Sequence, residues 1–393
     1  MLFRLRLSRV NLFGPKFNLF LLTLFLLVFP KGGIKVAGIP LTWGYLFLGM
    51  FSLAAILKGS IHVTRERLIS YLCLVPFQCF CALTMFFNGS SGLGLTISFW
   101  VSFLFLPLVF YLLFSHEIDS LDTRFFFRVF KTGIFFIAAY GIFLFALKQV
   151  TGRFLEIPLL TTNLGDLGEL ENKHINRGIV FKLISTYNNG NIFGVCILIL
   201  LPLYCFLEEG KWRGAIVKLS LILTFSRTVW FGLILHELCF PFLVTRNLSK
   251  TLFTMMKRLI AIVVCLLALL SYYGFAFRFL ISSDLGGRRE TLNLLNSINL
   301  FAREPFGSIC EIVYAGVAIS FGWLALPLFL FGISAPLFYQ MFSKRLSIPH
   351  RCIALGLFNY LFISCSDGAL LLIPTLAFYW FFLSLLHRKE IQC

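Results

Sequence analysis

Thr224-Phe225-Ser226-Arg227-Thr228-Val229-Trp230 places a charged side chain inside a long apolar stretch of the chain. The eleven residues that end at Phe225 contain only three polar side chains, and residues 228–244 contain only two ionisable ones, His236 and Glu237. A guanidinium stays charged at any accessible pH, and a charge at membrane depth costs several kcal/mol. Arg227 is therefore predicted to lie in a functional site.

The apolar stretch around Arg227 is too long for one membrane-crossing helix. Trp212 to Val244 comprises 33 residues, which would form a helix of about 50 Å, whereas the hydrocarbon core is about 30 Å thick. The sequence therefore predicts two helices, Trp212–Phe225 and Thr228–Val244, that meet near Ser226-Arg227. The first is short, about 21 Å, so Arg227 is expected below the membrane surface but open to water.

The composition of the whole chain is that of an integral membrane protein. Of its 393 residues, 59% are hydrophobic and 13% charged, whereas soluble domains carry roughly 25% charged residues. The formal net charge is +17, but most cations lie in short loops beside apolar runs. That distribution follows the positive-inside rule and argues against a nucleic-acid partner.

Apolar runs divide the chain into about twelve transmembrane helices, which makes residues 1–393 a single, all-α polytopic membrane domain. Basic clusters in alternate loops predict that both termini face the cytoplasm. The predicted spans are Phe17–Pro30, Ile39–Leu57, Leu68–Phe87, Leu95–Phe114, Val129–Leu147, Asn191–Leu207, Trp212–Phe225, Thr228–Val244, Leu259–Phe277, Tyr314–Gln340, Cys352–Cys365 and Ala369–Leu386.

Two long loops, residues 151–190 and 278–313, fall on the outer side in this topology. Loops of such length are usually functional or disordered. In the second loop, residues 291–302 place apolar side chains at helical spacing, which predicts an amphipathic helix at the outer membrane surface. Such a helix would cover a cavity and present Arg288 and Arg289 at its mouth.

Three stretches, taken in order, resemble the bacterial family of O-antigen polymerases and O-antigen ligases. The first is Ser185-Thr186-Tyr187-Asn188-Asn189-Gly190-Asn191, and the second is Thr224-Phe225-Ser226-Arg227 followed by an apolar helix. The third is Gly287-Arg288-Arg289, followed by Glu304-Pro305-Phe306-Gly307 and then Gly322. The resemblance covers residues 185–322, which are expected to form the catalytic region.

The resemblance implies a membrane glycosyltransferase of GT-C-like architecture in the bacterial inner membrane, with its active site facing the periplasm. The implied donor is an undecaprenyl-diphosphate-linked oligosaccharide, and the implied reaction joins repeat units without a metal ion or other cofactor. Membrane lipid is a further expected partner, and a chain-length regulator and a flippase are possible protein partners. No Asp-x-Asp pair offers metal ligands.

Arginine side chains suit the leaving group that the resemblance implies. Guanidinium groups bind diphosphate bidentately and offset its developing charge, and we assign this role to Arg227, Arg288 and Arg289. Glu311 is the candidate general base for the acceptor hydroxyl. Second-rank substrate-binding candidates are Arg177, Arg278, His174 and Tyr314.

Two alternatives remain open at the level of sequence. A ligase would join the glycan to lipid A–core, but the family's ligases carry a histidine where this chain has Glu311. The arginine–ten residues–glycine pattern of some polymerases is also not met, since twelve residues separate Arg177 from Gly190. A lipid-linked oligosaccharide flippase or transporter is the third reading, although the chain shows no internal repeat of the kind transporters carry.

The remaining intramembrane groups are interpreted structurally. His236 and Glu237 lie near mid-membrane, where ionisable residues are functional by default, but their distance from the predicted entry favours a buried structural pair. The eleven cysteines lie mostly in apolar runs and show no metal-binding spacing. Cys310 and Cys365 face the same compartment in the predicted topology and are the one candidate disulfide.

Overall fold

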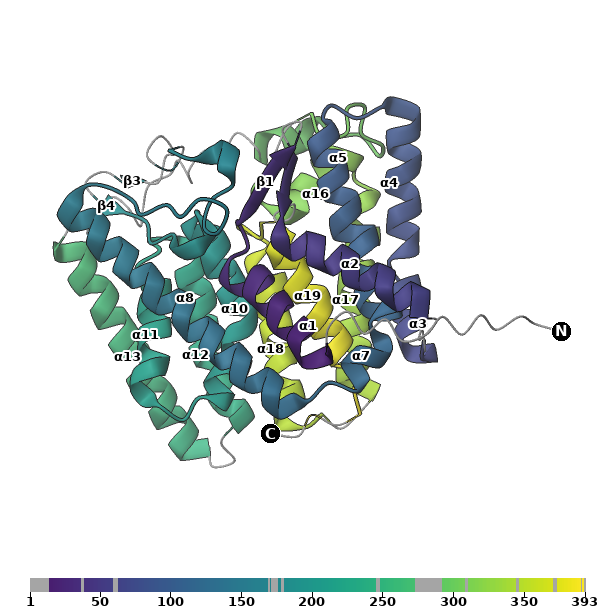
Figure 1. Cartoon of the computed structure of the whole chain (residues 1–393). Coiled ribbons are helices and arrows are strands. Elements are labelled where there is room, and N and C mark those ends of the chain that lie inside the picture. The colour runs from purple at the N-terminus through teal and green to yellow at the C-terminus, as the bar shows by residue number, and fades with distance from the viewer. Residues whose placement is uncertain are drawn as a thin grey trace.

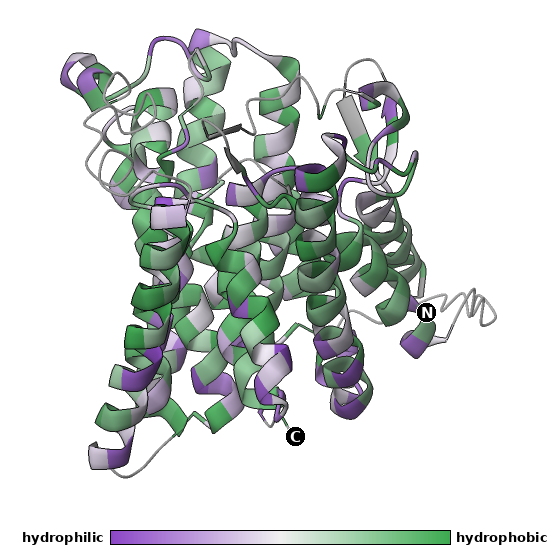
Figure 2. Ribbon diagram, turned by 90° about the vertical axis from the view of Figure 1, so that its left-hand side faces the viewer, coloured by the Kyte–Doolittle hydropathy of each residue, from purple (hydrophilic) through white to green (hydrophobic). Residues whose placement is uncertain are grey.

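The computed structural model describes residues 14–36, 39–58, 63–168, 170, 176–177, 180–244, 248–272, 292–307, 310–343, 346–369, 373–389 and 391. Most of these residues are helical. Figure 1 shows the helices gathered into one bundle, and Figure 2 shows an apolar belt around the bundle with polar residues concentrated toward its two ends. This distribution is that of a protein embedded in a membrane.

The first half of the chain contains α1 (Pro15–Leu22), η1 (Thr23–Val28), β1 (Gly33–Val36), β2 (Ile39–Thr42), α2 (Trp43–Lys58), α3 (Arg65–Leu72), α4 (Val75–Asn88), α5 (Leu93–Trp100), η2 (Val101–Phe105), α6 (Leu106–Leu108), η3 (Val109–Leu113), α7 (Ser115–Asp119), α8 (Thr123–Thr151), η4 (Leu164–Asp166), β3 (Asn176–Arg177), β4 (Val180–Phe181) and η5 (Ser185–Tyr187). The second half contains α10 (Gly190–Leu207), α11 (Lys211–Ile222), α12 (Arg227–Val244), α13 (Leu248–Tyr272), η6 (Leu295–Ser297), α16 (Val313–Phe321), α17 (Ala325–Ser343), α18 (Ile348–Ile363) and α19 (Ile373–Leu385).

Seven helical stretches within the described residues are long and apolar enough to cross a membrane. They are residues 65–88, 93–113, 123–151, 190–207, 227–244, 249–272 and 325–343, and each overlaps a predicted span. Four shorter apolar helices cover residues 15–28, 43–57, 348–363 and 374–385. The all-α membrane class is therefore confirmed, whereas the number of twelve spans and the orientation of the chain stay predictions.

Helix α10 forms the centre of the bundle. Fourteen of its eighteen residues, from Gly190 to Tyr204, are buried, and it packs against α12, α18 and α19. The backbones of α10 and α18 touch closely, because a Cβ added at Gly356 would collide with the carbonyl of Ile199. A helix that is apolar on every face is stable either in a protein core or in lipid, and α10 lies in the protein core.

The chain between α1 and α2 forms a β-hairpin, which the sequence did not predict. Strands β1 and β2 pair antiparallel, with Gly33 opposite Thr42 and Val36 opposite Ile39. The expected helix at residues 39–57 therefore begins only at Trp43, whose indole Nε1 donates to the carbonyl of Leu159 at 2.7 Å. Because the hairpin packs against the first long loop, the tertiary contact overrides the apolar pattern of residues 39–42.

The predicted span Tyr314–Gln340 is wrong as a single helix. It divides into α16 and α17 at Gly322, which has φ +101°. A side chain at Gly322 would collide with the carbonyl of Leu300. The break therefore lets the second long loop approach the bundle closely, because only glycine fits this conformation without strain.

The amphipathic helix predicted for residues 291–302 is also wrong beyond Ser297. Helical geometry ends with η6, and Ile298 is extended at φ −83° and ψ 134°. The following residues bond to neighbouring elements instead, since Ala302 N donates to Phe321 O at 3.2 Å and the Asn88 side chain donates to Ala302 O at 3.0 Å. Their apolar side chains are still used for packing, as Phe301 stacks on Phe80 at 5.3 Å between ring centroids.

Candidate functional site

The polar interruption at Arg227 is the break between two helices, as the sequence predicts. Helix α11 ends at Ile222, and α12 begins at Arg227. Phe225 between them has φ +48° and is 3% exposed, a conformation rare for a bulky residue. The indole Nε1 of Trp230 donates to the carbonyl of Ile222 at 2.8 Å and so joins the two helix ends.

The Ser185–Asn191 stretch lies against this break. Leu183 N donates to Leu223 O at 2.9 Å. A Cβ added at Gly190 would lie 2.6 Å from Leu183 O and 3.4 Å from Thr224 O, so no larger residue fits there. The first two stretches that carry the family resemblance, separated by more than thirty residues in sequence, therefore meet in space.

Asn189 and Asn191 have distinct roles at the start of α10. The Asn189 Oδ1 caps the helix by accepting hydrogen bonds from Asn191 N at 2.8 Å and Ile192 N at 3.3 Å. The Asn191 side chain extends away from its own helix, and its Nδ2 donates to Asp367 Oδ2 at 2.7 Å. Its Oδ1 is buried and has no hydrogen-bond partner among the described residues.

The turn after α18 brings an acidic residue to the same place. Asp367 is only 4% exposed. Its neighbour Ser366 lies 2.9 Å from Thr228, measured between the hydroxyl oxygens, and Thr228 directly follows the partly buried Arg227. A carboxylate, an amide and two hydroxyls are therefore held beside the first turn of α12. We call Asn191, Arg227, Thr228, Ser366 and Asp367 the Arg227 cluster.

Glu311 and Tyr314 lie next to the Arg227 cluster. Gly368 N donates to Glu311 O at 3.4 Å, and Val313 N donates to Ser364 O at 3.2 Å. These two bonds tie the start of α16 to the turn that holds Asp367. The Glu311 side chain is exposed, whereas the Tyr314 hydroxyl donates to Leu361 O at 2.5 Å and is committed to the backbone of α18.

The other sequence candidates cannot be placed in this cluster. His174, Arg278, Arg288 and Arg289 lie outside the described residues. The backbone of Arg177 belongs to β3, where it pairs with Val180 of β4. Of the predicted site residues, Arg227 begins the helix whose Thr228 contacts the Asp367 turn, and the backbone of Glu311 bonds to the same turn; a shared role of their side chains stays a prediction.

Sequence reasoning missed Asp367 and Ser366. The segment Ser364–Gly368 reads as a short polar turn, which is a common feature between membrane helices. One signal was available, because Asp367 is the only acidic residue between Glu311 and Glu390. Only the packing of α18 against α10 and α12 shows that this carboxylate meets Asn191.

His236 and Glu237 are the buried members of a larger ionic group, whose two cations are partly exposed. Both His236 and Glu237 are 0% exposed, which confirms that they are buried. Glu237 lies between two cations, with its Oε1 2.5 Å from Lys218 Nζ and its Oε2 3.6 Å from Arg258 NH1. His236 Nε2 is 3.7 Å from the same Oε1. The group, named here the Glu237 cluster, links α11, α12 and α13.

No metal-binding group is found among the described His, Cys, Asp and Glu residues. Neither Cys310 nor Cys365 is bonded to another cysteine in the structure, so the disulfide considered for them does not form. Cys365 is exposed and Cys310 is half-buried. The Arg227 cluster itself offers one guanidinium, one carboxylate, one amide and two hydroxyls.

Comparison with known proteins gives no match to a family model, to a curated protein or to a solved structure. The class that the fold supports is a polytopic, mostly helical membrane protein.

Proposed function

We propose that this chain is an O-antigen polymerase, a metal-independent glycosyltransferase that joins lipid-diphosphate-linked oligosaccharide repeat units at the periplasmic face of the bacterial inner membrane. The observation that carries the proposal is a convergence. Two stretches that resemble the polymerase and ligase family, Ser185–Asn191 and Thr224–Arg227, meet each other and the start of α16 at one end of apolar helices.

The groups that converge suit a glycan and a diphosphate. Arg227 offers a fork of donors for phosphate oxygens. The buried Oδ1 of Asn191 lacks a donor among the described residues, and a sugar hydroxyl supplies one. A buried acceptor without a partner costs free energy, so a bound hydroxyl at this position would stabilise the complex.

In the proposed reaction, the acceptor hydroxyl attacks the anomeric carbon of the donor glycan while the bond to the diphosphate oxygen breaks. Glu311, whose side chain is exposed, takes the hydroxyl proton. Arg227 offsets the negative charge that develops on the departing diphosphate. Asp367 touches no reacting atom in this scheme and acts as a positioning residue, because it holds the Asn191 amide.

Complementation of a deletion strain tests this proposal. A strain that lacks a polymerase accumulates lipid A–core carrying one repeat unit, and the wild-type chain should restore a long polysaccharide ladder. Arg227→Ala should reduce the polymer at least about 100-fold, which is the usual effect of removing one transition-state donor. Arg227→Lys should rescue little, because lysine lacks the bidentate fork. Glu311→Gln should also abolish the ladder.

Arg128→Ala is the matched control, because Arg128 is an exposed arginine of α8, and it should complement fully. A full ladder from Arg227→Ala would contradict the site assignment. Bare core in the deletion strain would instead identify a ligase. Purified protein that moves the lipid-linked glycan across vesicles but never elongates it would identify a transporter.

A further inference from the structure

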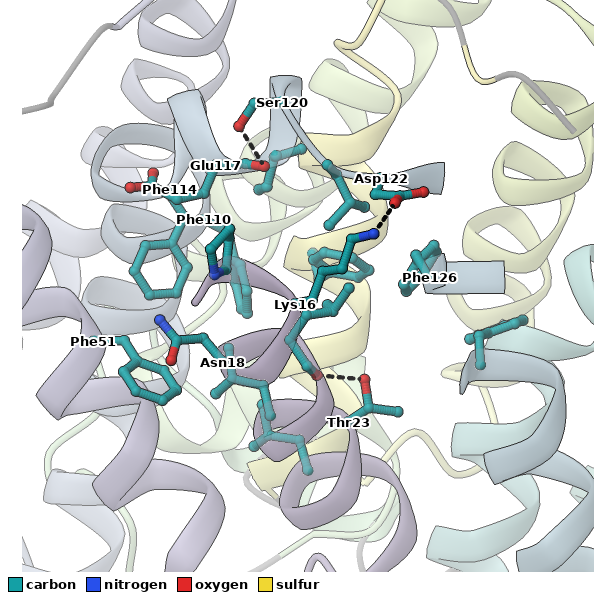
Figure 3. Close-up of a pocket in the computed structure, with 18 of the residues that line it drawn as sticks. Lys16, Asn18, Thr23, Phe51, Phe110, Phe114, Glu117, Ser120, Asp122 and Phe126 are labelled. Carbon is teal, nitrogen blue, oxygen red and sulfur yellow. Dashed lines mark hydrogen bonds and ion pairs between the residues drawn. The ribbon is translucent and has the colours of Figure 1, made fainter. Parts of the chain in front are cut away.

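A cavity of about 620 Å³ opens beside the start of α8 (Figure 3). Its walls come from α1, η1, α2, η3, α7, the first turns of α8, and α19. The loop that precedes α10 meets α8 at Ile137, where Ser185 Oγ donates to the backbone carbonyl, and the Tyr187 hydroxyl donates to Leu27 O in the inner wall of the cavity at 2.9 Å. The cavity volume lies in the range of about 300–1,000 Å³ typical of ligand pockets.

The walls of the cavity are apolar. Nine of its 27 lining residues are phenylalanines, among them Phe51, Phe110 and Phe126. The single hydroxyl deep in the wall, that of Thr23, donates to Leu19 O in its own helix at 2.8 Å. Leu200 of the central helix α10 also contributes to the lining. These walls suit a hydrocarbon chain and offer nothing to a sugar or a nucleotide.

The mouth of the cavity is polar and charged. Lys16 Nζ lies 2.8 Å from Asp122 Oδ2, while Glu117 and Asn18 lie on the other side of the opening (Figure 3). The Lys16 side chain and the backbone N–H of Phe125 hold the pKa of Asp122 below its usual value, so the Asp122 carboxyl is ionised at neutral pH. Asn18 Oδ1 is buried and lacks a hydrogen-bond partner among the described residues.

We propose that this cavity binds one acyl chain of a zwitterionic phospholipid whose headgroup combines a phosphate with a primary ammonium. The acyl chain fills the phenylalanine-lined interior. The ammonium, a donor with three N–H groups, meets Glu117, and the phosphate meets Lys16. An anionic headgroup without an ammonium fits poorly, because the mouth carries two carboxylates and one lysine.

Native mass spectrometry of the purified full chain tests the acyl-chain site. The protein is exchanged into a mixture of phosphatidylethanolamine and phosphatidylglycerol with identical acyl chains. Ala55→Trp fills the cavity, since Ala55 is 4% exposed and lines it. It should retain one lipid fewer than wild type. The control Leu53→Trp changes a neighbouring residue that is 57% exposed and outside the lining, and it should bind as wild type does.

The headgroup is tested in the same mixture. Wild type should retain phosphatidylethanolamine at least about tenfold more often than phosphatidylglycerol, a difference of about 1.4 kcal/mol. Glu117→Gln should remove most of this preference without changing the number of bound lipids. If Ala55→Trp folds and retains as many lipids as wild type, the acyl-chain site is wrong. If wild type holds both lipids equally, or prefers phosphatidylglycerol, the headgroup assignment is wrong.

Discussion

Asp367 shows how one side chain can organise a site that spans distant parts of the chain. It accepts the hydrogen bond of Asn191 from α10, while its neighbour Ser366 contacts Thr228 of α12. The same turn bonds to the backbone of Glu311 and Val313. Because Asp367 is only 4% exposed, its carboxylate is stabilised by hydrogen bonds within the protein rather than by water.

The Asp367→Ala variant should lower both stability and polymer formation. The substitution leaves the Asn191 amide without its acceptor, and an unsatisfied buried group costs about 1–3 kcal/mol. Asp367→Asn keeps an acceptor oxygen and should retain a clearly visible ladder. Thermal unfolding in detergent and the ladder assay measure the two effects. Equal loss of polymer in both variants, with wild-type stability, would mean that Asp367 itself takes the proton.

Glu237 offers a second prediction at the residue scale. Removing one partner of a buried ion pair costs about 3–5 kcal/mol, because the remaining charge stays uncompensated. Glu237→Leu should therefore lower the thermal stability strongly, since Lys218 and Arg258 lose their shared carboxylate.

The double variant Glu237→Leu/Lys218→Met should recover part of that stability, because it also removes one of the stranded cations. A double-mutant cycle measures the coupling between the two residues. Strictly additive effects of the two substitutions would contradict a structural ion pair.

At the scale of elements, close helix packing positions the Arg227 cluster. The first turns of α10 and α12 approach so closely that a Cβ at Gly194 would collide with the side chain of Val229. This contact sets Asn191 and Thr228 against the turn that follows α18. The polar residues of α10 and α12 therefore come together only because a small residue, glycine, lets the two helices approach each other closely.

The Gly194→Ala variant should be destabilised by about 1–3 kcal/mol, the usual cost of overpacking a core. Gly49→Ala is the matched control, because Gly49 also lies within a helix, α2, but its added Cβ meets nothing within 4 Å. That control should be neutral or slightly stabilising, since alanine favours helix more than glycine does. Similar unfolding temperatures for both variants would contradict the close contact between α10 and α12.

At the scale of the whole molecule, the bundle has two chemically different polar regions. One end carries the Arg227 cluster, whereas the charged mouth of the phenylalanine-lined cavity lies beside the start of α8. The positive-inside distribution of arginine and lysine predicts that the Arg227 end faces outward.

Cys365 provides a direct test of orientation, because it is exposed in the turn beside Asp367. In a background in which Cys79, the other exposed cysteine of the described residues, and Cys310 are replaced by serine, a maleimide that cannot cross the inner membrane should label Cys365 in cells with a permeable outer membrane. Cys365→Ser should remove the signal, and the buried Cys196 should stay unlabelled. Labelling of Cys365 only after the inner membrane is opened would reverse the predicted orientation.

The sequence by itself determined the membrane class, the positions of most helices and the break before Arg227. These follow from the length of apolar runs and from the cost of a charge in hydrocarbon, which are local properties that a single chain reveals. The tertiary structure decided the β1–β2 hairpin, the division at Gly322 and the end of helix at Ser297, because each depends on a backbone contact with a distant segment. It also decided the site, since Asp367 gains its role only from Asn191, which lies 176 residues earlier in the chain.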